Sequence, residues 1–128
     1  MTSRSQLVRQ VLSRSLAELV KYMTYLRVVR PKVLDNAIAL AMGRNVPDHS
    51  ARKVAMNVLH RMREKLVFRG PLVDRVILAT YNEVKRFEPG RCPFCGLPAE
   101  QLKKNHFAQH MREISEIVMN VARNLGLA

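Results

Sequence analysis

Two cysteines and two histidines near the carboxyl end constrain the fold of this chain more than any other feature. Cys92, Cys95, His106 and His110 follow the spacing C-x2-C-x10-H-x3-H. Two thiolates and two imidazoles are a complete tetrahedral ligand set for zinc, with no coordination position left for a substrate. The sequence therefore predicts one structural zinc ion per chain.

The residues next to these ligands suit a metal site. Gly96 follows Cys95 and allows a tight turn, so that main-chain amides can approach the thiolates. His106 and His110 are four residues apart, which places both rings on one face of a helix. The chain has only two cysteines, too few for the disulfide framework of a secreted protein.

The segment resembles the C2H2 zinc finger, and Cys-Pro-Phe-Cys-Gly also resembles the zinc knuckle of many ribbon proteins. The resemblance covers about residues 92–110. Ten residues separate Cys95 from His106, where the family usually has about twelve. Ala99 and Lys103 stand where the family has an aromatic residue and a leucine. We expect other apolar residues to form the small core instead: Leu97, Leu102 and Phe107.

A redox pair is the alternative, because Cys-Pro-Phe-Cys also resembles the glutaredoxin active site. That family places the pair after an early strand of an α/β domain, whereas helical segments precede it here. Elsewhere the sequence shows no paired carboxylates, glycine-rich phosphate loop or Ser/His/Asp order, and His49 and His60 lack evident catalytic partners. We therefore prefer the metal site and expect no enzymatic activity.

Prolines and glycines divide the rest of the chain into segments of mostly helical periodicity. We expect helices at about residues 5–29, 33–42 and 51–66, and a long last helix at 98–125. Residues 72–87 also fit helical spacing. The alternative there is a small β wing built from residues 66–69 and 75–81, but these lack strict alternation.

The predicted fold class is therefore all-α, or mainly α with a small β wing. We expect a helical bundle with a helix-turn-helix-like unit at residues 1–88. Residues 89–128 should form a zinc knuckle and the long last helix, both packed on that bundle. The first helix carries an apolar seam that suits a partner helix and favours a homodimer, unless it packs internally: Leu12, Leu16, Leu19, Met23 and Leu26.

The third predicted helix is the most regular amphipathic segment. Asp48 or Ser50 can cap its first amides. Its apolar positions fall on one arc, which predicts a buried face: Ala51, Val54, Ala55, Val58, Leu59, Met62 and Leu66.

Positive charge indicates a polyanionic partner. The net charge is +12, and the surplus lies in residues 1–33, with seven basic residues and one acidic, and in residues 50–70, with six and one. Few aromatic residues are available for stacking on single-stranded RNA, so duplex DNA is the expected partner.

Residues 33–66 resemble a helix-turn-helix unit, which implies that its second helix enters the major groove. We expect five outward residues of the basic helix 50–66 to contact DNA: Arg52, Lys53, Asn57, His60 and Arg63. Arg14 and Lys21 of the first helix are candidates for additional phosphate contacts.

The sequence thus predicts a zinc-containing DNA-binding protein that regulates transcription, loosely similar to the small regulators of archaea and their viruses. The alternative is an oligomeric assembly protein stapled by zinc, with an incidental basic surface. The start of the chain lacks a signal-peptide pattern, and the longest apolar run, residues 37–42, is too short to span a bilayer. We therefore expect a cytoplasmic protein without a membrane partner.

Overall fold

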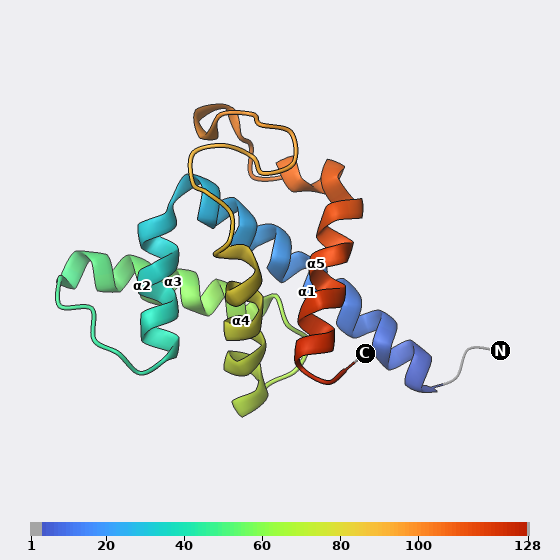
Figure 1. Cartoon of the computed structure of the whole chain (residues 1–128). Helices are drawn as coiled ribbons and strands as arrows, with labels where there is room; N and C mark the ends of the chain where they lie inside the picture. Colours follow the sequence, from blue (N-terminus) through green and yellow to red (C-terminus); the bar gives the residue numbers. More distant parts are fainter. Residues whose placement is uncertain (1–3, 128) are drawn as a thin grey trace.

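The computed structural model describes residues 4–127, apart from the side chains of residues 4, 5, 7 and 8. Within this range the fold is all-α, as predicted, with one isolated β-bridge between Arg91 and Pro98 and no named strand. Five α-helices and two short 3-10 helices follow one another (Figure 1): α1 Arg4–Val29, α2 Pro31–Ala41, α3 His49–Glu64, α4 Pro71–Val84, η1 Ala99–Gln101, η2 His106–His110 and α5 Met111–Asn124.

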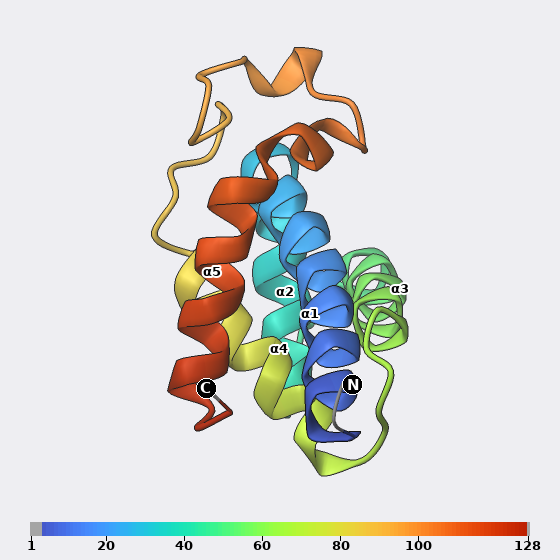
Figure 2. The same ribbon diagram turned by 90° about the vertical axis from the view of Figure 1, so that its right-hand side faces the viewer.

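Helix α1 is the centre of the bundle. It contacts all four other α-helices as well as η1 and η2, and α3 and α5 lie on opposite sides of it (Figure 2). Four residues of its apolar seam, Leu16, Leu19, Met23 and Leu26, are buried inside the chain, and Leu12 is half-buried. The seam therefore packs internally and no longer argues for a second copy, so the homodimer stays a prediction.

The helix interpretation of residues 72–87 is confirmed in substance by α4, and the β wing is absent from the described residues. Pro71 occupies the first turn of α4, where its fixed backbone angle suits a helix and no amide is lost. The buried residues of α4 recur at helical spacing on one face, and all but Glu83 are β-branched: Val73, Val76, Ile77, Thr80, Glu83 and Val84.

The long helix predicted for residues 98–125 is wrong in its first half. Helix α5 begins only at Met111, and residues 99–110 form η1, η2 and the turns between them. Leu102 and Phe107 are buried within this irregular segment. Helix α5 itself packs against α1 and α4.

Helix α3 begins and packs largely as predicted. The Asp48 carboxylate accepts a hydrogen bond of 2.8 Å from the Ala51 amide, which confirms the cap. Ala55, Val58, Leu59 and Met62 are buried. Val54, expected on the inner face, is 41% exposed because α3 crosses α2 steeply and its first turns extend beyond it (Figure 1).

The segment after α4 is tied to the carboxyl end of α1. The Arg27 guanidinium donates hydrogen bonds to the main-chain oxygens of Phe87 (2.8 Å) and Lys85 (2.9 Å). The Gly90 amide donates to the Val28 oxygen at 3.0 Å. These bonds fix where the cysteine loop starts.

Among the described residues, no helix combines the length and apolar character needed to cross a bilayer.

Candidate metal centre and basic face of α3

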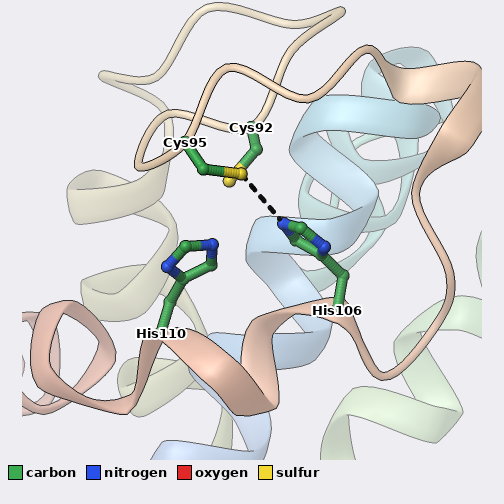
Figure 3. A group of neighbouring side chains, drawn as sticks. All are labelled: Cys92, Cys95, His106 and His110. Atoms are coloured by element: carbon green, nitrogen blue, oxygen red, sulfur yellow. Dashed lines mark hydrogen bonds between the residues drawn. The ribbon is translucent and has the colours of Figure 1, made fainter.

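The four predicted ligands meet at one end of the bundle. Cys92 and Cys95 come from the loop after α4, and His106 and His110 come from η2 (Figure 3). One donor atom of each residue lies within 4.8 Å of the other three. Cys95 Sγ and His106 Nε2 are 3.5 Å apart, and tetrahedral zinc bonds of ordinary length would separate sulfur and nitrogen by about 3.6 Å. The site is therefore large enough for one metal ion.

His110 has a nitrogen that a metal ion would satisfy. Its Nε2 is buried and makes no hydrogen bond within the described part of the chain. A buried polar atom without a hydrogen-bond partner costs free energy of folding, and a metal ion bound to Nε2 would remove that cost. The other nitrogen, Nδ1, lies 4.0 Å from a carboxylate oxygen of Glu113. A carboxylate behind the ring is the usual arrangement around metal-binding histidines, because it orients the ring and keeps the proton on Nδ1.

The surroundings of His106 also favour metal binding. Burial, and then the neighbouring His110, lower the pKa of His106, which favours the neutral ring that can bind a metal. Its Nδ1 lies 3.0 Å from the side-chain amide nitrogen of Gln109. When Nε2 binds a metal, Nδ1 carries the proton, and a half-turn of the Gln109 amide would present its oxygen as the acceptor.

The cysteine loop has the tight turn that the sequence predicted. Gly96 has a φ of +76°, a left-handed conformation that suits glycine, and its amide donates to the Cys92 carbonyl at 2.9 Å. The Phe94 amide donates to the Cys92 sulfur at 3.4 Å. Burial raises the pKa of the Cys92 thiol, an effect opposed by main-chain amides of Phe94 and Cys95 that favour the thiolate. A bound cation would shift that balance further toward the thiolate.

A small aromatic core supports the ligands. Phe94 makes edge-on contacts with Phe87, at 5.5 Å between ring centres, and with Phe107, at 6.0 Å. The predicted core residues Leu102 and Phe107 are buried, and Leu97 is half-buried. Sequence reasoning missed Phe87 and Phe94. The core is thus continuous with the bundle, and four protein ligands close the coordination sphere, which fits a structural metal rather than a catalytic one.

The five predicted DNA-contacting residues all lie away from the buried face of α3, but they differ in how free their side chains are. Lys53 and Asn57 are exposed and have no side-chain partner among the described residues. Arg52 lies 3.3 Å from His49 Nδ1, and His60 Nε2 lies 2.8 Å from Glu64. Arg63 donates two 2.9 Å hydrogen bonds to Asp74 of α4. Arg63 therefore joins two helices.

Sequence reasoning missed Arg61 and Lys65, which continue the line of Lys53 and Asn57 at intervals of four residues. That spacing places the four residues in one row along the helix. The same spacing could have identified Arg61 and Lys65 from the sequence. Of the additional candidates, Arg14 is exposed, and Lys21 is ion-paired with Glu18 at 2.7 Å.

No protein-family model, curated protein or solved structure matches this chain. Its function therefore has to be inferred from the residues and surfaces described above.

Proposed function

We propose that this chain is a zinc-stabilised DNA-binding protein that regulates transcription, with the exposed face of α3 as the contact surface. Zinc is the metal that two thiolates and two imidazoles in a closed tetrahedral set bind most typically. Its role is to hold the cysteine loop and η2 together at the end of the bundle, beside α1 and the start of α5.

One observation carries the DNA-binding proposal. Helix α3 buries Ala55, Val58, Leu59 and Met62 on one side, while Lys53 and Asn57 extend from the other side without a partner in the described chain. A lysine can bind a phosphate, and an asparagine can pair with an adenine edge in the major groove. These two residues are therefore the first candidates for phosphate contact and base contact.

The arrangement of α2 and α3 supports the same function. The two helices are joined by residues 42–48, and α3 packs across α2 (Figure 1). Helix α3 lies at the side of the bundle, where a duplex can approach it (Figure 2). In helix-turn-helix proteins the second helix occupies the groove and the first crosses the backbone. The alternative assembly function is less well supported, because the seam on α1 is buried within the chain.

The test is the binding of a fluorescein-labelled 20-base-pair duplex, followed by anisotropy over a salt series. Arg52→Ala, Lys53→Ala and Asn57→Ala combined should lower the affinity at least about tenfold and reduce the salt slope by up to about two. The control combines Arg75→Ala with Lys103→Ala, which removes the same charge from exposed positions outside α3. Equal affinity of the folded triple variant and the control would overturn the proposal.

A further inference from the structure

A second feature of the basic surface is a hollow of about 560 Å³ between α1, the end of α3 and the segment that carries His106. We call it the α1–α3 groove. The lining residues that matter most come from all three parts of the chain: Lys21, Tyr22, Arg30, Arg61, Lys65 and Lys104.

The groove is strongly positively charged. Five cationic side chains line it, and Glu18 is the one carboxylate among the described residues of its wall. Glu18 is already ion-paired with Lys21 at 2.7 Å. The other four cations therefore have no carboxylate in the groove to neutralise them. Bringing them together from separate elements costs repulsion, which an anion placed among them would relieve.

The cations converge around Tyr22. The Lys65 ammonium lies 5.3 Å from the centre of the Tyr22 ring. Burial raises the pKa of the Tyr22 hydroxyl, while a hydrogen bond and charge from Arg61, and the charge of Arg30, act in the opposite direction. Both guanidinium groups are therefore close enough to influence this hydroxyl. A set of hydrogen-bond donors therefore lines one hollow around Tyr22.

We propose that the α1–α3 groove binds a phosphate group. Arginine pairs with phosphate through two parallel hydrogen bonds, lysine supplies point charge, and a tyrosine hydroxyl donates one further bond. The phosphate belongs either to a free nucleotide or to a nucleic-acid strand. In the second case the inference rests on the proposed function, because Arg61 and Lys65 extend the row of Lys53 and Asn57 on α3 into the groove.

The segment that carries the candidate metal ligand His106 forms one wall of this groove. Lys104 and Asn105 directly precede the ligand His106, and Phe107 and Ala108 directly follow it, and all four line the hollow. A metal ion at His106 would fix this wall, so phosphate binding should require it. Chelation of the metal should therefore weaken phosphate binding even while the helices remain folded.

The test compares two double variants of equal charge in the zinc-loaded full chain. The groove variant combines Arg61→Ala with Lys104→Ala. The control combines Arg75→Ala with Lys103→Ala, and Lys103 is the direct neighbour of Lys104 but lies outside the groove. The probes are AMP, inorganic pyrophosphate and the labelled duplex. Calorimetry measures the first two, and anisotropy measures the third.

If the phosphate comes from a nucleotide, AMP or pyrophosphate binds the wild-type chain saturably, and the groove variant loses at least about tenfold in affinity. If it comes from a strand, only the duplex shows this loss. In both cases the control should change less than about twofold. Equal weakening by both double variants, or no weakening of any probe, would overturn the groove proposal. The α3 variant Arg52→Ala, Lys53→Ala and Asn57→Ala tests the proposed function separately, because it leaves the groove intact.

Discussion

The carboxylate of Glu113 lies 4.0 Å from Nδ1 of His110, while Nε2 of the same ring is directed toward the cysteines (Figure 3) and is buried without a partner in the described chain. Helix α5 starts at Met111, so this pair joins its first turn to the metal centre. Glu113 is therefore placed to orient the ring of His110 toward a metal ion bound at its Nε2.

Glu113→Ala should therefore weaken zinc binding about 10- to 100-fold and leave the fold intact, because a metal-bound histidine depends on the outer group that orients its ring. Competition with a chromophoric chelator measures the affinity. Glu116→Ala, an exposed residue of the same helix, is the matched control. Equal zinc affinity of the two variants would show that Glu113 does not position His110.

Zinc affinity should rise with pH between about 6.5 and 8.5. Burial raises the pKa of the Cys92 thiol above its ordinary value, so near neutral pH the metal-free thiol holds a proton that zinc must displace. Burial lowers the pKa of His106, so its ring is already neutral in this range. Each displaced thiol proton adds about tenfold in affinity per pH unit. A flat profile in chelator competition would mean that zinc finds the Cys92 thiol already ionised.

Removal of the metal should destabilise the protein without unfolding the helices. Phe107 of the metal segment is the largest fully buried side chain, but most of the others lie in the helices, among them Leu19, Met23, Leu34 and Ile77 of α1, α2 and α4. At free zinc about 100 times its dissociation constant, the ion contributes about 2.7 kcal/mol. EDTA, or Cys95→Ser, should therefore lower the melting temperature while most of the far-UV helical signal at 20 °C persists. Complete loss of that signal would show that the bundle depends on the metal.

The ligand set could be predicted from sequence because its information is local: residue types and spacing define it. The path of the chain through residues 98–110 could not. Pro98 and the apolar Leu102 and Phe107 fit a helix. The structure has turns and 3-10 segments there instead, because both apolar side chains are buried and because His106 and His110 lie beside the cysteines. Tertiary contacts of this kind override local propensity.

The α1–α3 groove could not be predicted for a different reason. Arg61 is 40 residues from Lys21 and 43 residues from Lys104 in sequence, and only the packing of α1, α3 and the metal segment brings the three together. Segment charges indicated a basic surface, but they carried no information about which cations share a hollow.

The two sides of α3 should respond differently to the same substitution. Val58 is 7% exposed, and Val58→Asp would place a charge in the core at a cost of about 3–5 kcal/mol, enough to unfold much of the protein. Val54 is 41% exposed, so Val54→Asp should cost less than about 1 kcal/mol. Urea unfolding followed by circular dichroism compares the two. Similar losses would mean that α3 is rotated from the orientation described.

Arg63 should contribute less to DNA binding than Lys53, although both were predicted to contact DNA. Its guanidinium already donates two hydrogen bonds to Asp74, so a phosphate or base would have to compete with that carboxylate. The pair is solvent-exposed on both sides, which limits its contribution to stability to about 1 kcal/mol.

Arg63→Ala should therefore lower stability by up to about 1 kcal/mol in urea unfolding and leave the salt slope of duplex binding nearly unchanged. Lys53→Ala should leave stability unchanged and reduce the slope by about one, because its ammonium is free to release a counterion from a phosphate. Asp74→Asn separates the two roles of Arg63: it weakens the pair but keeps the arginine. An increase in duplex affinity in that variant would show that Asp74 restrains Arg63 from DNA. A loss of salt slope in Arg63→Ala equal to that in Lys53→Ala would show instead that the pair opens when DNA binds.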